Sequence, residues 1–108
     1  MKPDALKKML PLSETAFYIL LCLQEEAHGY AIMQQVAEMT RGRIHLGPGT
    51  VYGTLAKMEK DHLIRVTAEE KRRKVYILTE SGRTLLGLEI NRLGELMSNA
   101  GDQWREKR

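Results

Sequence analysis

Several absences limit what this protein can be. The single cysteine, Cys22, excludes an internal disulfide, and its apolar neighbours favour a small buried side chain over a redox or modification site. No apolar run approaches the ~20 residues that a membrane-spanning helix requires. The stretch from Met1 to Asp4 also lacks the apolar character of a signal peptide. We therefore expect a cytoplasmic protein that has no membrane partner.

Residues for catalysis or metal binding are missing as well. The histidines at positions 28, 45 and 62 show no metal-ligand spacing with one another or with Cys22. The sequence has no paired carboxylates and no nucleophile–base set, and the Gly-Pro-Gly at 47–49 lacks the lysine and the glycine spacing of a phosphate-binding loop. We expect neither an enzyme nor a metal or cofactor.

The composition fits one folded domain. The chain has 108 residues, of which 43% are hydrophobic and 29% are charged. This length allows one modest hydrophobic core, and the balance is that of a globular chain and not of a disordered one. A net charge of +3 is compatible with nucleic-acid binding but is not diagnostic of it. The places where basic residues gather therefore matter more than their number.

The pattern of apolar residues predicts mainly helices and one short β-hairpin. Ser13 is a typical N-cap, and Pro48 suits the first position of a helix, where its missing N–H costs nothing. Two runs rich in β-branched residues predict the strands. The expected helices cover residues 3–10, 14–24 and 30–40, with two more from Pro48 and from Glu80 onward; the expected strands are 64–67 and 74–78.

The helix that starts at Pro48 carries candidate DNA contacts on its outer face. Val51, Leu55 and Met58 have the spacing of an inward face, so the polar residues between them point away. No arginine or asparagine is available there to read a base with two hydrogen bonds, so we expect specificity to depend on DNA shape and half-site spacing. The alternatives are a helix cap for Thr50, a tyrosine half-buried against the preceding helix for Tyr52, and a solvated lysine for Lys57. The candidates are Thr50, Tyr52, Thr54 and Lys57.

Basic residues also gather in the predicted hairpin. Arg72, Arg73 and Lys74 fall at or beside the expected loop at 68–73. A helix with such a hairpin beside it is the geometry of a winged helix-turn-helix, in which the helix enters a major groove and the hairpin, or wing, lies against the DNA backbone. A charged run can also be a solvated turn, and side chains along a strand alternate, so not all three can face DNA together. Arg43, before the helix, is a further candidate for a backbone contact.

The last helix carries an apolar stripe that is too long for the core of so small a domain. Its members alternate in spacings of four and three, like the a and d positions of a heptad, so we expect the stripe to pair with a second copy of the chain. An intramolecular core is the alternative. The members are Leu86, Ile90, Leu93, Met97, Ala100 and Trp104.

Three glycines recur on the same helix at positions 87, 94 and 101. Each costs about 1 kcal/mol relative to alanine in a helix interior. Either another backbone approaches closely on that face, or the helix is loosely held and partly frayed. Trp104 has two open roles, packing against the partner's N-terminal stretch and stacking on a ligand.

Several short segments occur in an order and spacing that is fairly specific. They are His28-Gly29-Tyr30, Gly49-Thr50-Val51-Tyr52, Glu59-Lys60-Asp61 and Leu78-Thr79-Glu80. Together they closely resemble the PadR family of bacterial transcriptional regulators, in the small subgroup whose C-terminal part is a single dimerisation helix. The resemblance implies a homodimeric winged-helix repressor, and many such proteins release DNA when a small molecule binds. It also implies that Tyr52 reaches a DNA phosphate.

The chain departs from the family pattern at three places. Family members usually have glycine at the position of His62, which often needs a left-handed backbone. The expected wing loop has no glycine and carries Glu69 and Glu70, which weaken phosphate contacts nearby. Drug-sensing members have a tryptophan in the middle of the last helix, where this chain has Leu93. The resemblance therefore does not extend to the binding of flat aromatic drugs.

We therefore expect a mainly helical fold with a small hairpin: a winged helix-turn-helix at residues 1–80 and a C-terminal dimerisation helix at 81–108. The expected function is sequence-specific repression by a homodimer bound to an inverted-repeat operator in double-stranded DNA. A small-molecule effector of unknown identity is one expected way of release. The alternative is a winged-helix adaptor that binds proteins, and a steep loss of DNA binding with salt would argue against it.

Overall fold

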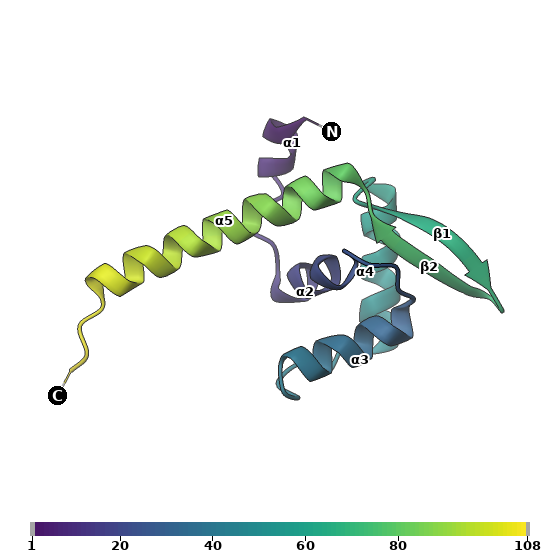
Figure 1. The fold of residues 1–108 in the computed structure, drawn as a ribbon, viewed down its shortest axis with the longest axis horizontal. Helices are drawn as coiled ribbons and strands as arrows, with labels where there is room; N and C mark the ends of the chain where they lie inside the picture. Colours follow the sequence, from purple (N-terminus) through teal and green to yellow (C-terminus); the bar gives the residue numbers. More distant parts are fainter. Residues whose placement is uncertain (1, 108) are drawn as a thin grey trace.

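A computed structural model describes residues 2–107 and has five helices and one antiparallel hairpin within them (Figure 1). The mainly helical class with a single hairpin and a long final helix is confirmed. The elements are α1 (Pro3–Lys7), α2 (Glu14–Cys22), α3 (Gly29–Met39), α4 (Pro48–Lys60), β1 (Ile64–Glu70), β2 (Arg73–Leu78) and α5 (Glu80–Gln103).

Side-chain caps explain where three of the helices begin. The Ser13 hydroxyl accepts a hydrogen bond from the backbone N–H of Ala16, and Thr79 does the same for Gly82 at the start of α5. The N-cap of α3 is His28, whose Nδ1 accepts from the N–H of Ala31 at 3.2 Å. Each cap satisfies a backbone donor that the first helical turn leaves without a partner. The third helix therefore starts slightly earlier than the sequence predicts.

One hydrophobic core lies between α2, α3, α4 and the first half of α5. Apart from Glu89, whose carboxylate binds Arg92 and the N–H of Leu12, its fully buried side chains carry no polar atoms, so close packing and removal from water hold these helices together. The fully buried members include Ile19, Leu20, Leu23, Ile32, Val36, Val51, Leu55 and Leu85. Because α4 contributes to this core from one side only, its opposite side stays available for contacts outside the chain.

The hairpin is longer and its turn tighter than the sequence predicts. The expected loop at 68–73 was wrong: only Lys71 and Arg72 lie between the strands, and their φ angles are 47° and 66°. Two successive positive φ values are the mark of a type I′ turn, whose twist matches that of the strands. Glu69 lies opposite Lys74 in the register, and such opposite-charge pairs stabilise a sheet although neither residue favours strands by itself.

A backbone bridge fixes the hairpin to the helical body. Ala27, in the link between α2 and α3, accepts from the N–H of Tyr76 at 2.9 Å and donates to the carbonyl of Tyr76 at 3.1 Å. Just before β1 begins, His62 has a φ of 60°, which confirms the left-handed conformation expected there. These contacts set the direction in which β1 and β2 leave the body.

The two halves of α5 have different surroundings. The first half packs against α1 and α2, whereas the second half extends away from every other element (Figure 1). Leu86 is only 3% exposed and belongs to the core of its own chain, so its assignment to a dimer contact is corrected. Leu93 is half-buried, while Ile90, Met97, Ala100 and Trp104 are exposed. None of the helices within residues 2–107 has the length and hydrophobicity of a membrane span.

Candidate nucleic-acid interface

The outer face of α4 is formed as the sequence predicts. Val51 and Leu55 are fully buried, whereas Thr50 and Lys57 are exposed and Thr54 is partly buried. The Lys57 ammonium lies 3.4 Å from a carboxylate oxygen of Asp61, one turn further along the helix. This pair is solvent-exposed on the lysine side and leaves the ammonium accessible to another anion.

Tyr52 lies at the edge of this face, and its side chain extends to the start of α3. A Cβ atom built on Gly29 would lie 2.6 Å from Cε1 of Tyr52 and 3.0 Å from its hydroxyl oxygen. The ring therefore rests on the bare backbone of Gly29, yet 49% of Tyr52 remains exposed. Glycine at position 29 leaves room for the ring, and the core beneath α4 sets the position of its Cα.

The wing brings its cations to the same place. A hollow of about 290 Å³ opens between the tip of the hairpin, α4 and the N-terminus of α3. We call it the basic hollow, and its lining residues are His28, Gly29, Tyr52, Arg72, Arg73, Lys74 and Tyr76. Four of the sequence-predicted DNA contacts, which lie up to 22 positions apart in the chain, thus line one cavity. Thr50, Thr54 and Lys57 lie outside it on α4.

The charges around the basic hollow are mostly positive, and the nearby acids are Glu69 and Glu70 on β1 and Glu59 on α4. Residues 69–74 contain four basic and two acidic side chains, so the tip has a net charge of +2. The Tyr76 hydroxyl, which also lines the hollow, is uncharged at neutral pH. Burial raises its pKa, and the nearby carboxylate of Glu59 raises this pKa further. The hollow therefore offers cations and hydroxyl groups, which is the chemistry that binds phosphate oxygens.

Comparison with known proteins identifies the family. The family described as transcriptional regulator PadR-like matches residues 19–88, which contain α3, α4 and both strands. The chain belongs to the PadR-like family of transcriptional regulators. Its resemblance to PadR proteins in sequence is thereby confirmed.

Two curated proteins are similar to this PadR-like chain. An uncharacterised 37.1 kDa protein in transposon TN4556 of Streptomyces fradiae is 36% identical over 80 residues, which cover 72% of this chain and 23% of that protein. The transcriptional regulator YqjI of Escherichia coli is 32% identical over 59 residues, which cover 55% of this chain and 28% of that protein. The matched part thus spans about a quarter of the length of these relatives.

Solved structures of PadR proteins have the same fold over nearly their whole length. A PadR-like transcription factor from Bacteroides fragilis is 27% identical with a TM-score of 0.72, and the match covers 92% of this chain and 98% of that one. A PadR family transcription regulator from Clostridium difficile R20291 is 26% identical with a TM-score of 0.73, and the match covers 83% and 97%. Both matches cover more of the chain than the PadR family region at residues 19–88 does.

Sequence reasoning missed three residues of the basic hollow, which are His28, Gly29 and Tyr76. His28 belongs to the His-Gly-Tyr segment, but its place is decided by its capping bond and by its stacking on Tyr30, at 6.5 Å between ring centres. Tyr76 reaches the hollow because of its bridge to Ala27, a contact between distant segments. In the sequence, only the alternation of apolar residues along β2 indicated on which face of the strand Tyr76 lies.

Arg43 does not join this site. Its guanidinium is hydrogen-bonded to the carboxylate of Glu14 at the start of α2, and this bond lowers the pKa of Glu14. Within residues 2–107, no group of three His, Cys, Asp or Glu side chains is arranged to hold a metal ion. Burial raises the pKa of the Cys22 thiol to about 11, which keeps it protonated at neutral pH and unreactive.

Proposed function

We propose that this PadR-like regulator is a cytoplasmic, homodimeric repressor that binds double-stranded DNA through α4 and the wing. The observation that carries the proposal is the basic hollow, where cations from the wing, the Tyr52 hydroxyl and the N-terminus of α3 converge beside the outer face of α4. In winged helix-turn-helix proteins, a helix placed like α4 enters the major groove while the wing lies on the adjacent backbone. The hollow then meets the phosphates that border the groove.

The chemistry of α4 favours indirect readout of the operator. Its exposed surface carries Thr50, Tyr52, Lys57 and Lys60 together with small residues such as Gly53 and Ala56. Hydroxyl and ammonium groups bind phosphates well, whereas bidentate base contacts come mainly from arginine, asparagine and glutamine. Specificity then rests on DNA shape and on the distance between two half-sites of an inverted repeat.

Dimerisation sets the distance between the two DNA-binding units and hence between the half-sites that they fit. In this proposal residues 1–80 form the DNA-binding unit and 81–108 the dimerisation segment, in which the exposed second half of α5 joins the two heads. A small-molecule effector would act as an inducer only if it binds more tightly to an arrangement whose spacing does not fit the operator. A protein-binding adaptor is the second candidate, because the outer face of α4 has little base-reading chemistry.

A gel-shift titration with the DNA upstream of the protein's own gene, at about 50 and 200 mM salt, tests the proposal. We expect Tyr52→Ala and the triple alanine variant of Arg72, Arg73 and Lys74 to lose binding. The triple variant should also flatten the slope of log K against log salt by roughly 1 for each phosphate contact removed.

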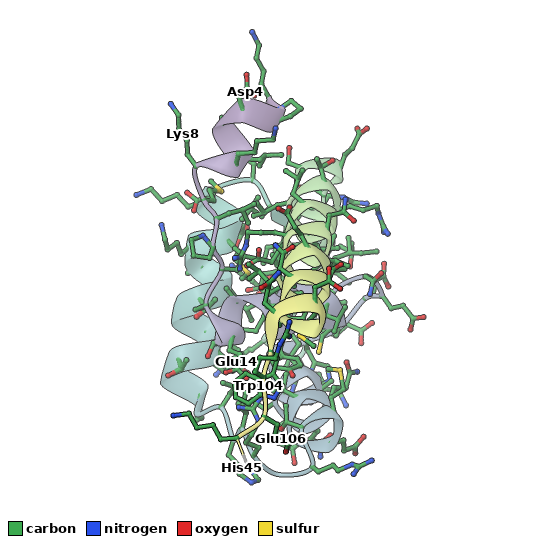
Figure 2. The ribbon with its side chains drawn as sticks, turned by 90° about the vertical axis from the view of Figure 1, so that its left-hand side faces the viewer. Asp4, Lys8, Glu14, His45, Trp104 and Glu106 are labelled. Carbon is green, nitrogen blue, oxygen red and sulfur yellow. The ribbon has the colours of Figure 1, made fainter. Side chains whose placement is uncertain are left out.

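A matched control removes the same charge elsewhere. Lys2, Lys7 and Lys8 lie on or beside α1 and are exposed, and the side chain of Lys8 points into solvent (Figure 2). Their triple alanine variant should bind DNA nearly as well as the wild-type protein. If both triple variants lose affinity equally, the wing has no special role; if the wild-type protein prefers no DNA, the adaptor becomes the better proposal.

A further inference from the structure

His28 occupies a position that is unusual for a histidine. It is the N-cap of α3, where its Nδ1 accepts a hydrogen bond from the backbone N–H of Ala31 at 3.2 Å. Serine, threonine, aspartate and asparagine are the usual N-cap residues, and α2 and α5 begin with Ser13 and Thr79. Capping by itself therefore does not explain why an imidazole stands at this position.

The capping bond fixes which nitrogen of the ring carries the proton. A backbone N–H can only donate, so Nδ1 must be the acceptor and has no proton. In the neutral imidazole the proton is then on Nε2, which becomes a hydrogen-bond donor. Within residues 2–107 no group accepts a hydrogen bond from Nε2, so this donor is available to an acceptor outside the chain.

The ring is held in place at the border of the basic hollow. It stacks on Tyr30, with 6.5 Å between the ring centres and 23° between the ring planes. It lines the basic hollow together with Tyr52 and the cations of the wing, and it also lines a second hollow of about 430 Å³ beside the wing. Because Nδ1 is turned toward the first turn of α3, Nε2 is the nitrogen that can serve a ligand in these hollows.

We propose that His28 contacts DNA directly, by donating a hydrogen bond from its neutral Nε2–H to a phosphate oxygen in the basic hollow while Nδ1 caps α3. The inference rests on the DNA binding proposed above and adds a residue to its contact surface. Arg72, Arg73 and Lys74 attract the phosphate by charge, whereas the imidazole adds a donor whose direction is set by the fold. A donor that is held in place before binding loses little conformational entropy when the contact forms.

Two amide side chains replace the two nitrogens of the ring separately. In His28→Asn the amide oxygen is attached to Cγ, as Nδ1 is in histidine, so it can cap α3, but no polar atom reaches as far as Nε2. In His28→Gln the amide nitrogen lies one bond further out, about where Nε2 lies in histidine. Glutamine is not among the preferred N-cap residues, so this variant keeps the donor and weakens the cap.

The two variants should therefore change stability and DNA affinity in opposite order. We expect His28→Asn to unfold in urea at the wild-type midpoint or slightly above it, yet to bind DNA about tenfold more weakly for each protomer and about 100-fold for the dimer. His28→Gln should unfold at a lower midpoint but bind DNA more tightly than His28→Asn. If His28 were only a cap, affinity would follow stability and the order of the two affinities would be reversed.

His62→Asn is the matched control. His62 is exposed and lies outside the basic hollow, and asparagine tolerates its positive φ of 60°. This variant also loses one imidazole, and it should bind DNA as tightly as the wild-type protein. Fluorescence anisotropy with labelled duplexes measures the affinity of all three variants.

Two further measurements separate a neutral donor from a contact through charge. A neutral donor releases no counterion, so the slope of log K against log salt should be the same in His28→Asn and in the wild-type protein, unlike in the triple variant of the wing. A phosphate contact carries no sequence information. His28→Asn should therefore weaken binding to the DNA upstream of the gene and to a random duplex of equal length by the same factor.

Three results would overturn the proposal: wild-type DNA affinity in His28→Asn, affinities of the two variants that follow their stabilities, or a salt slope that flattens by about 1 in His28→Asn. Failure of the proposed function gives a different result. If the wild-type protein selects the upstream DNA and His28→Asn binds it equally tightly, only the role of His28 is rejected. If His28→Asn loses affinity for both duplexes and the wild-type protein prefers neither, the phosphate contact is supported and sequence-specific repression is rejected. A wild-type protein that binds neither duplex rejects both.

Discussion

Replacing Gly29 by alanine separates the position of Tyr52 from the stability of the fold. Gly29 is the first residue of α3, and a φ in the left-handed region is not required of it, so alanine suits the backbone. The new methyl group would lie 2.6 Å from Cε1 of Tyr52. Carbon atoms in contact stay about 3.5–4.0 Å apart, so the tyrosine ring must move by roughly 1 Å.

The structure allows that movement at little cost to folding, whereas the proposed contact of Tyr52 with DNA would be lost. Tyr52 is 49% exposed, and its ring can swing outward without displacing the core. We expect the free energy of unfolding to change by no more than about 0.5 kcal/mol. A hydrogen bond from the displaced hydroxyl to a phosphate contributes about 1.5–3 kcal/mol. Losing about 1.5 kcal/mol in each protomer weakens operator binding by roughly 100-fold for the dimer.

Fluorescence anisotropy with a labelled operator and thermal unfolding provide the two measurements. Tyr52→Phe removes only the hydroxyl, so it should weaken binding about as much as Gly29→Ala. In the double variant, Gly29→Ala should add little, because the contact that it disturbs is already gone. Two results would contradict this mechanism. In the first, Gly29→Ala weakens DNA binding equally in proteins with and without the Tyr52 hydroxyl. In the second, Gly29→Ala binds DNA like the wild-type protein while Tyr52→Phe binds it more weakly.

Three further changes have distinct expected results. Arg72→Gly relieves a positive φ of 66° in the turn, so thermal unfolding should shift upward while operator affinity falls; a loss of both would contradict the turn geometry. Gly82→Ala places a Cβ 2.0 Å from the carbonyl oxygen of Leu63, and we expect urea unfolding to show a loss of about 3 kcal/mol or more. Glu89→Gln should destabilise the protein more at pH 7 than at pH 3. Arg92 and the N–H of Leu12 lower the pKa of Glu89 in the folded protein. The Glu89 carboxylate therefore stabilises the fold at any pH above the unfolded-state pKa of about 4.3. This stabilisation is lost progressively as the pH falls toward the lower folded-state pKa. A constant difference between the two pH values would contradict this.

Local chemistry made much of the fold predictable. Ser13 and Thr79 cap helices because their hydroxyls reach a nearby backbone N–H, and such contacts span only three residues. The inner face of α4 follows from the spacing of Val51, Leu55 and Met58. The hairpin was expected with strands that were too short, because Glu69 and Lys74 favour strands only as a pair across the sheet.

Only the tertiary structure decided which residues of these elements meet. Leu86 and Ile90 have the same helical spacing in the sequence, yet the core covers the first and leaves the second exposed. The place of the Tyr52 ring on Gly29 depends on how α3 and α4 pack, which no local pattern contains.

The sequence by itself thus determined the winged-helix class, the membership of the PadR-like family and the polar face of α4, because periodicity, caps and motifs are local. The tertiary structure decided the shape of the basic hollow, the two-residue turn of the wing, and the burial of Leu86 beside the exposed Ile90 on α5. These features depend on contacts between segments far apart in the chain, and side-chain packing selects among arrangements that local propensities leave nearly equal in energy.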